Sequence, residues 1–573
     1  MNAPSEQARL GENPDPAFAH PAGPPKQTQT KVDGSRSTVA SRQISPDHVP
    51  RLCWWWLALI LALGLGLRVD ALRQETDFGF NLGAQSDSME AYEVAVSLLK
   101  GEPRAQYLGQ PNFNIHSKLP GPLWAAFCAA GLKLFGTIRG AAMLVLLTGT
   151  GAIFLTFLLV VPAIGVRAAL WAALLQATSP LAVHYSIIVF NPSVMPFLGG
   201  LFLLALWRVT QRDDSPAIGW VGFLLLIMPQ FHFSSVVLAP AAVVVWWLSK
   251  RRLNWAWLSF GLIAGLICYG PYVYGEIMHH WQNTVGMTAG SPGRYSTTAL
   301  KVFIAPLAFL YNDWSPRWAY TADEYREICR ACFGSLGGAM AANILAAIAV
   351  SAVMAGAVAL GVRAMRGFWR SPRETFARSP GVTFLVLVMV MPLACAFLMG
   401  QPFHPRYALM LLAPLFGLSG AAVVTWNAQP RAGRFVGPII CAVVAANIWF
   451  ILRIYRVQDA LIETTPRFVP SFRHLDRVYQ TLQSHAGDNR MVELRDDDYI
   501  RNLSPQEAHS LAGAELIRRY IIVRYREMGE PTNQETRPSR YILHRGSEVE
   551  AGNPSVVYHR NGIAIVAAPL EPP

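Results

Sequence analysis

The stretch CWWWLALILALGLGL, residues 53–67, contains no charged side chain and begins two residues after Arg51. It lies too far from the N-terminus to be typical of a removed secretory signal, and it lacks a small-residue cleavage site. A helix needs about 20 predominantly apolar residues to cross the hydrocarbon core of a bilayer. We therefore interpret this stretch as the first transmembrane helix.

Apolar runs of the same kind continue along the chain. Hydrophobic residues make up 52% of its 573 residues and charged residues only 15%, with a mean hydropathy of +0.29. A soluble chain typically carries about 25% charged residues. The composition and the runs predict an all-α polytopic membrane protein with about eleven transmembrane helices. The runs after the first are 141–162, 166–190, 193–209, 216–230, 233–249, 254–276, 337–361, 381–400, 407–427 and 434–453.

The positive charges are concentrated in short connections between the apolar runs. The formal net charge is +12, but no basic, aromatic-interleaved motif indicates nucleic-acid binding. With eleven spans, the basic clusters fall on the side of the N-terminal tail, and the positive-inside rule makes that side cytoplasmic. We expect a multi-pass protein of the bacterial inner membrane. The clusters lie at 208–212, 250–252, 363–378 and 431–434.

The remaining segments divide the chain into three parts. A Pro-, Ser- and Gly-rich tail without apolar periodicity predicts a disordered cytoplasmic segment. A charged C-terminal region with strand-like stretches at 520–525 and 540–545, and a predicted hairpin around Asn561–Gly562, indicates a small soluble α/β domain on the external side. The parts are a tail at 1–50, a membrane domain at 51–455 with external loops at 71–140 and 277–336, and a C-terminal domain at 456–573.

The first external loop contains the stretch QSDSMEAYEVAVSLLKGEP, residues 85–103. Its apolar spacing predicts an amphipathic helix from Ser88 to Leu99. Met89, Tyr92, Val96 and Leu99 would share one face. Asp87 or Ser88 is a natural N-cap for such a helix, and Glu90 would complement its dipole in the first turn. Taken alone, the two carboxylates therefore have a structural explanation.

The end of the same loop places a cation next to a membrane-facing helix. Lys118 directly precedes Leu-Pro-Gly-Pro at 119–122, and a short apolar segment follows to residue 136. That segment is too short to span a bilayer, so we expect it to lie along the membrane face. Lys118 either snorkels toward water or holds an anionic lipid phosphate.

The order of these pieces resembles the GT-C glycosyltransferases, in particular bacterial protein O-mannosyltransferases and lipid A aminoarabinose transferases. That branch typically has a transmembrane helix, an acidic D-E-x-x-Y motif, a Leu-Leu-x-Gly-like turn, a K-P-P-L-like segment and an amphipathic helix ending in Leu-Phe-Gly. The resemblance covers roughly residues 50–455. The matching pieces are 87–92, 98–101, 118–123 and 133–136, followed by 177–208 and the HPRYALMLLAPLF segment at 404–416.

The resemblance implies transfer of a sugar from a polyprenyl-phosphate donor to a hydroxyl of a lipid, glycan or protein on the external face, with inversion. Asp87 is then the preferred catalytic base and Glu90 the second choice. Lys118 and Arg406 would bind the donor phosphate. The chain departs from the family in placing Asp87 five residues before Tyr92 rather than four.

No cofactor is expected. The family often has a second acidic residue near the end of the third span, where this chain has Asn191, so we predict no metal site. A divalent metal stays open as an alternative. Cys329 and Cys332 form a lone CxxC, for which a disulfide or two free thiols are favoured over zinc.

Further candidate substrate contacts lie at the external ends of the apolar runs. For His232 the alternative is a hydrogen-bonded structural histidine in a tight helical pair, and for His404 and Arg406 it is snorkelling at the interface. The rival function is a transporter or a lipid-linked sugar flippase, but no clear internal repeat supports it. The candidate contacts are Tyr92, His116, His232, His404, Tyr407 and Arg294.

Overall fold

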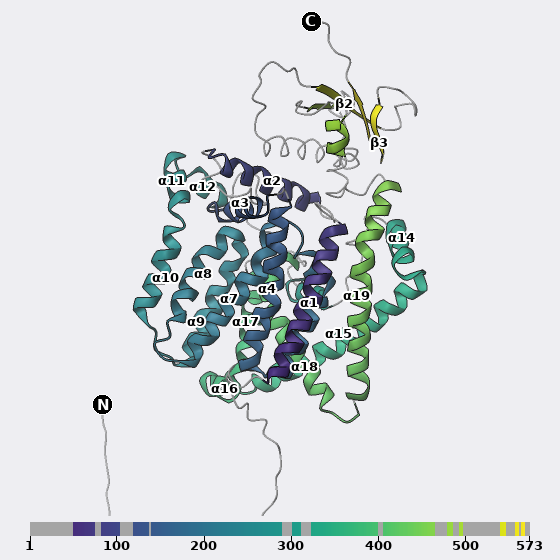
Figure 1. The fold of residues 1–573 in the computed structure, drawn as a ribbon. Coiled ribbons are helices and arrows are strands. Elements are labelled where there is room, and N and C mark those ends of the chain that lie inside the picture. The colour runs from purple at the N-terminus through teal and green to yellow at the C-terminus, as the bar shows by residue number, and fades with distance from the viewer. Residues whose placement is uncertain are drawn as a thin grey trace, which may run out of the picture. The chain divides into compact units, whose positions relative to one another are not determined.

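The computed structural model shows a bundle of helices and a small sheet (Figure 1). Residues 1–49 lie outside the described part of the chain, and the predicted tail with them. The structure describes residues 50–74, 82–102, 119–136, 139–288, 301–310, 322–398, 405–431, 433–464, 478–484, 492–496, 539–545, 556–560 and 563–567.

Within the described residues, seven helical segments are long and apolar enough to cross a membrane. A bent pair, α10 (Trp255–Ile267) and α11 (Gly270–Met278), forms an eighth span if its two halves are counted together across a bend of 44°. The predicted all-α polytopic architecture is therefore confirmed. The seven comprise α1 (Arg51–Gln74), α4 (Gly140–Ala163), η3 (Asn191–Val194) with α7 (Met195–Gln211), α15 (Leu336–Ala364), α17 (Pro380–Leu398), η8 (Pro405–Leu411) with α18 (Leu412–Asn427), and α19 (Gly433–Thr464).

Two further apolar helices form the tight pair that the sequence predicts around His232. Helix α8 (Ala217–Phe231) ends one residue before His232, and η4 (Phe233–Val237) leads directly into α9 (Leu238–Ser249). Both arms are shorter than the length needed for a straight crossing.

The predicted span at 166–190 is wrong as a single helix. Helix α5 (Val166–Thr178) stops at Ser179, and a new short helix, α6 (Pro180–His184), begins there. Proline disfavours helical geometry in the residue before it, and Ser179 is accordingly extended. The Ser179 hydroxyl then caps α6 by accepting a hydrogen bond from Ala182 N at 3.3 Å.

The loop predicted at 71–140 contains two helices, α2 (Leu82–Leu99) and α3 (Leu123–Phe135). Helix α2 begins six residues earlier than predicted, so neither Asp87 nor Ser88 is its N-cap. The predicted apolar face is also shifted, because Leu99 is exposed. The buried stripe consists of Ala91, Tyr92, Ala95 and Val96, each at most 3% exposed.

The loop predicted at 277–336 contributes several short helices. One of them, α14 (Ala322–Phe333), is held against α19 by the Trp449 indole N–H, which donates to the Cys332 carbonyl oxygen at 2.9 Å. Cys329 and Cys332 are buried free thiols. Of the two favoured interpretations of the CxxC, the structure therefore has the two free thiols and not the disulfide. The elements are α12 (Gln282–Thr288), α13 (Lys301–Ile304), η6 (Ala305–Phe309) and α14 (Ala322–Phe333), with α16 (Pro372–Arg378) in a basic connection further along.

The C-terminal region contains a four-stranded sheet in the order β1-β2-β4-β3. Strand β2 coincides with the predicted strand at 540–545, and β3 and β4 are antiparallel, as the predicted hairpin requires. The strand-like stretch at 520–525 lies outside the described residues. The strands are β1 (Val492–Asp496), β2 (Ser539–Arg545), β3 (Val556–Arg560) and β4 (Ile563–Ala567).

Glycines allow α8 and α10 to pack closely. A Cβ added at Gly261 would overlap the carbonyl oxygen of Gly219 on the facing helix. We expect Gly261→Ala to destabilise the protein by about 1–3 kcal/mol, because neither backbone can retreat without disturbing its own helix. Thermal unfolding in detergent should show a lower melting temperature. Gly66→Ala is the control, since no atom lies within 4 Å of the added Cβ. An unchanged melting temperature for Gly261→Ala would contradict this packing.

Candidate functional site

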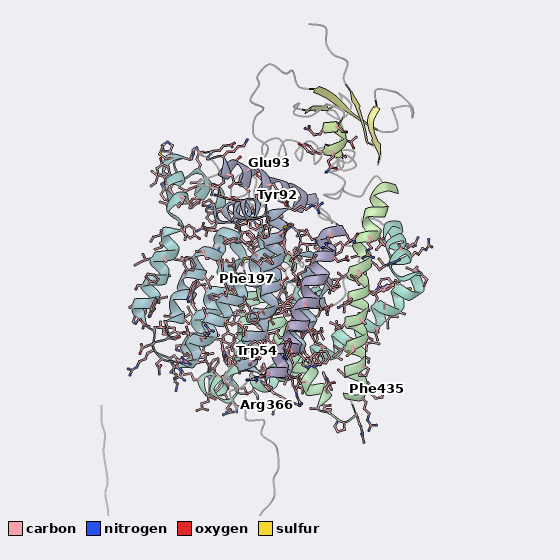
Figure 2. The ribbon with its side chains drawn as sticks, viewed as in Figure 1. Trp54, Tyr92, Glu93, Phe197, Arg366 and Phe435 are labelled. Atoms are coloured by element: carbon pink, nitrogen blue, oxygen red, sulfur yellow. The ribbon has the colours of Figure 1, made fainter. Side chains whose placement is uncertain are left out.

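Helices α2 and α3 lie against each other at one end of the bundle (Figure 1). Tyr92 and Glu93 mark this end, whereas Trp54 and Arg366 lie near the other (Figure 2). The Trp124 side chain of α3 is fully buried and stacks on Phe127, with ring centroids 5.6 Å apart. Phe127 in turn meets Phe231, the last residue of α8, edge-to-face at 6.2 Å. This chain of aromatic contacts connects α3 to the residue before His232.

The Pro-Gly-Pro segment that follows Lys118 packs on the same end of α8. Gly121 has a φ of +123°, and a Cβ at this position would overlap the Gln230 side-chain amide. Gln230 is fully buried, and neither atom of its amide has a hydrogen-bond partner within the described part of the chain. The left-handed backbone and the close approach both require glycine here.

Four residues form a cluster of rings and one guanidinium, which we call the His232–Arg406 cluster: Phe190, His232, Arg406 and Tyr407. The Arg406 guanidinium lies over the Phe190 ring at 5.5 Å and over the Tyr407 ring at 5.4 Å. The His232 and Tyr407 ring centroids are 5.3 Å apart. The ring faces hold the cation by electrostatic attraction and restrict its position.

The histidine of this cluster is neutral at ordinary pH. His232 lies in the turn between α8 and η4. Burial, and then the positive charge of Arg406, lower its pKa to about 3. Its Nδ1 makes a hydrogen bond with the Ser234 hydroxyl at 2.5 Å. Arg406 is therefore the positive charge of the cluster, while His232 supplies a neutral ring.

The cluster is extended by aromatic residues from two more segments. Tyr185 stacks on Phe190 at 6.5 Å and meets Phe309 at 6.2 Å. The Ser179 hydroxyl donates to the Phe309 carbonyl oxygen at 2.7 Å, which ties η6 to the start of α6. Segments more than 200 residues apart in sequence, from Ser179 to Tyr407, thus meet at one place.

Three of the candidate residues predicted from the sequence, His232, Arg406 and Tyr407, come together in this cluster. Tyr92 is 1% exposed and belongs to the packing between α2 and α3, while Glu90 is partly exposed on α2. Sequence reasoning missed Phe190 and Gln230; the run Gln230-Phe231-His232 after a proline was the available signal. His116, Lys118, Arg294, His404 and the side chain of Asp87 lie outside the described residues.

Metal ligands do not gather in the part of the chain that the structure describes. No group of three or more His, Cys, Asp or Glu side chains is placed there to hold an ion. Asn191 begins η3 and directly follows Phe190 of the cluster. The family that the sequence resembles often has an acidic residue at this position.

The contact between Gly121 and Gln230 gives a direct test of this arrangement. We expect Gly121→Ala to lower the melting temperature, since a non-glycine residue in such a backbone conformation costs about 1–3 kcal/mol. The overlap with Gln230 adds to that cost. Gly101→Ala is the control for backbone strain without a steric overlap. Gly101 has a φ of +74°, and no atom lies within 4 Å of the added Cβ. Adding Gln230→Ala to Gly121→Ala should restore part of the lost melting temperature, because the overlapping side chain is removed. If the double variant lost the sum of the two single decreases in melting temperature, the contact between Gly121 and Gln230 would be contradicted.

No protein-family model and no curated protein matches the chain. Solved structures do match it. ArnT from Cupriavidus metallidurans, bound to undecaprenyl phosphate, superposes with a TM-score of 0.53 at 12% sequence identity, covering 90% of this chain and 98% of ArnT. The chain has a GT-C fold.

Further solved structures match the chain. The apo state of the same ArnT gives a TM-score of 0.53 at 13% identity with the same coverage. The archaeal oligosaccharyltransferase AglB from Archaeoglobus fulgidus gives 0.39 at 12% identity, covering 87% of this chain and 70% of AglB. The two ArnT structures confirm the predicted GT-C architecture at the level of the fold.

Proposed function

We propose that this protein is a membrane glycosyltransferase that transfers a sugar from a polyprenyl-phosphate donor to an acceptor hydroxyl. The observation that carries the proposal is the GT-C fold, shared over 90% of the chain with an ArnT structure that holds undecaprenyl phosphate. The His232–Arg406 cluster supports it independently, because it presents one cation among aromatic rings at the end of the bundle that α2 and α3 cover.

In this proposal the donor phosphate binds to Arg406. The planar guanidinium fork matches two phosphate oxygens, and the flanking rings of Phe190 and Tyr407 fix its direction. Lys118 is the second phosphate contact. Its neighbour Leu119 is 2% exposed, and two residues later Gly121 packs on Gln230, close in sequence to His232. The contact of this Pro-Gly-Pro segment with α8 supports our choice of the preceding residue, Lys118, as the second phosphate contact.

Asp87 is the proposed catalytic base. Position 87 lies four residues, about one helical turn, before Ala91, and so borders the buried stripe of α2. Position 90 falls outside that stripe, and Glu90 is partly exposed. We therefore keep Asp87 as the preferred base, because position 87 borders the buried stripe of α2 in the helix register and position 90 does not.

The reaction that we propose is a single displacement. The carboxylate of Asp87 accepts the proton of the acceptor hydroxyl, whose oxygen forms a bond to the anomeric carbon of the sugar. The bond between that carbon and the phosphate oxygen breaks, and polyprenyl phosphate leaves with the electron pair. Arg406 and Lys118 stabilise the charge that develops on the departing phosphate. Attack opposite the leaving group inverts the anomeric configuration.

The same proposal includes the arrangement in the membrane. Eleven crossings place the N-terminal tail and the basic connections in the cytoplasm. The cluster, α2, α3 and the C-terminal α/β domain then lie on the external side. A preactivated lipid donor suits that side, where ATP is absent, and the chain carries no phosphate-binding P-loop motif.

Comparison of cell-envelope lipids and glycans by mass spectrometry tests this function in the cell. Cells with the intact protein should contain a lipid, glycan or protein that carries one additional sugar. Cells that lack the gene should lose that species and accumulate its unmodified acceptor. Identical lipid, glycan and glycoprotein profiles in the two strains would contradict the proposal.

A further inference from the structure

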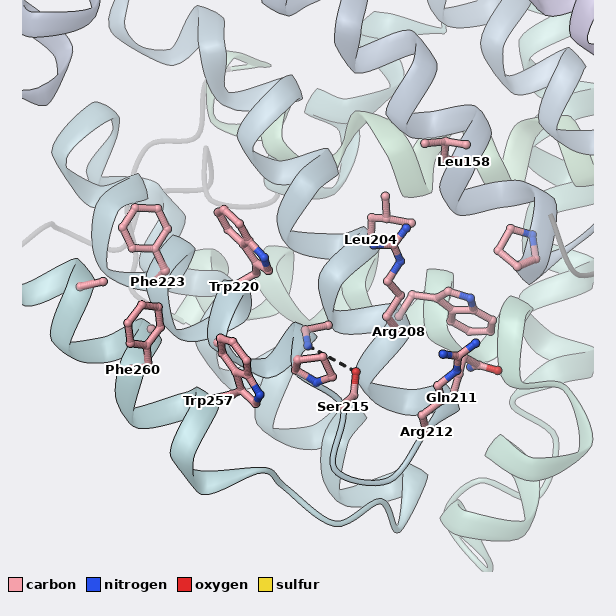
Figure 3. Close-up of a pocket in the computed structure, with 17 residues that line it drawn as sticks. Leu158, Leu204, Arg208, Gln211, Arg212, Ser215, Trp220, Phe223, Trp257 and Phe260 are labelled. Atoms are coloured by element: carbon pink, nitrogen blue, oxygen red, sulfur yellow. Dashed lines mark hydrogen bonds between the residues drawn. The ribbon is translucent and has the colours of Figure 1, made fainter. Parts of the chain in front are cut away.

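A cavity of about 940 Å³ lies at the end of α8 opposite the His232–Arg406 cluster. Helix α8 has fifteen residues, so this cavity at its start is about 20 Å from the cluster at its end. One wall is aromatic and is formed by Trp220 and Phe223 of α8 with Trp257 and Phe260 of α10 (Figure 3). The volume lies in the range of ligand sites, which is about 300–1,000 Å³.

The other side of the cavity carries two guanidinium groups. Arg208 and Arg212, at the end of α7, line it together with Gln211 (Figure 3). Both arginines are exposed, and neither forms an ion pair with any residue that the structure describes. Their charges are therefore available to an anion from outside the chain.

The adjacent carboxylate of Asp213 is already engaged. It accepts a hydrogen bond from the Arg252 backbone N–H at 2.9 Å and forms an ion pair with Arg251 at 3.3 Å. The Arg252 N–H, followed by the charge of Arg251, lowers the pKa of this carboxyl, so that it stays ionised and bound to its own partners. This contact also fixes the connection after α7 against the one after α9.

The shape and the position of the cavity select the class of ligand. Trp220 is 62% exposed and Phe260 is 64% exposed on two apolar helices, a composition that suits contact with lipid chains better than contact with water. A small water-soluble anion would use the arginines but leave the aromatic wall bare. A molecule with a phosphate and acyl chains fills both halves.

We propose that this cavity binds an anionic phospholipid, with its phosphate on Arg208 and Arg212 and an acyl chain along Trp220, Phe223, Trp257 and Phe260. This site is separate from the donor site and does not depend on the proposed transferase activity. It lies at the end of the bundle that carries the basic connections, where the positive-inside rule places the anionic cytoplasmic leaflet.

Native mass spectrometry of the full-length protein in detergent tests this site. Phosphatidylglycerol should remain bound in preference to phosphatidylcholine with the same acyl chains. R208A/R212A should weaken phosphatidylglycerol binding about tenfold or more and remove the preference, because each arginine adds attraction for the anionic headgroup. R208K/R212K should keep most of the preference. The matched control is R363A/R366A, which removes two exposed arginines from the same end of the bundle but outside the cavity.

Two further measurements distinguish binding of a lipid from binding of a free anion. Trp220→Ala should weaken phosphatidylglycerol binding several-fold while leaving both arginines in place. A large excess of inorganic phosphate should not displace the lipid. Equal retention of phosphatidylglycerol by wild type and R208A/R212A would overturn the proposal. Displacement of phosphatidylglycerol by inorganic phosphate would also overturn it, as would wild-type phosphatidylglycerol binding by Trp220→Ala.

Discussion

Replacement of Asp87 by asparagine should reduce sugar transfer by about 10²–10⁴-fold, the usual contribution of a positioned general base. Asparagine has nearly the same size as aspartate but cannot accept the hydroxyl proton at neutral pH. The donor should still bind, because the proposed phosphate contacts are untouched, so the loss should appear in kcat rather than in KM. Initial rates with a purified enzyme and a polyprenyl-phosphate sugar measure both quantities.

The neighbouring carboxylates of α2 are the controls for this prediction. Glu90→Gln and Glu93→Gln remove a negative charge from the same helix, one and two turns after Asp87. We expect each to keep transfer within about tenfold of wild type, since partly exposed charges contribute modestly. Full activity of Asp87→Asn with loss of activity in Glu90→Gln would assign the base to Glu90 and contradict the register argument. Membrane insertion and elution volume should be the same for all three variants.

Replacement of Arg406 by alanine should raise the KM for the donor about tenfold to a hundredfold, since a charge-assisted hydrogen bond to phosphate contributes about 1.5–3 kcal/mol. The rate at saturating donor should also fall, because the departing phosphate loses its cation. Arg406→Lys keeps the charge but loses the planar fork and its stacking on Phe190 and Tyr407. Its KM for the donor and its rate at saturating donor should therefore lie between those of Arg406→Ala and the wild type.

Arg73 provides the matched control for Arg406. It is an exposed arginine in the last turn of α1. We expect Arg73→Ala to leave the KM for the donor within about twofold of wild type, as for most exposed surface charges. Equal KM values for Arg406→Ala and Arg73→Ala would remove Arg406 from the donor site.

The fold was predictable from the sequence because lipid imposes a simple rule. Backbone groups in a bilayer must be satisfied within the helix, so long uncharged runs such as 53–67 and 337–361 become helices with little ambiguity. The breaks were harder to predict. Ser179–Pro180 interrupts an apolar run whose composition looks continuous, and the bend between α10 and α11 falls within another.

The candidate site was predictable only in part, because its residues meet through tertiary packing. The apolar runs place Arg406 and His232 at helix ends, but they do not show that the rings of Phe190 and Tyr407 surround the guanidinium. The start of α2 was missed because the polar residues before Ser88 resemble a cap. The apolar face of α2 was predicted only in part: Tyr92 and Val96 are buried, but Ala91 and Ala95 complete the stripe and Leu99 is exposed.

The measurement that tests the central claim most directly is sugar transfer by the purified protein in proteoliposomes, with a polyprenyl-phosphate sugar as the only donor. We predict formation of a glycosylated acceptor together with release of free polyprenyl phosphate in equal amounts. Asp87→Asn should form both products at least about a hundredfold more slowly. Movement of the intact polyprenyl-phosphate sugar across the bilayer without cleavage of its sugar–phosphate bond would contradict the account and identify a flippase instead.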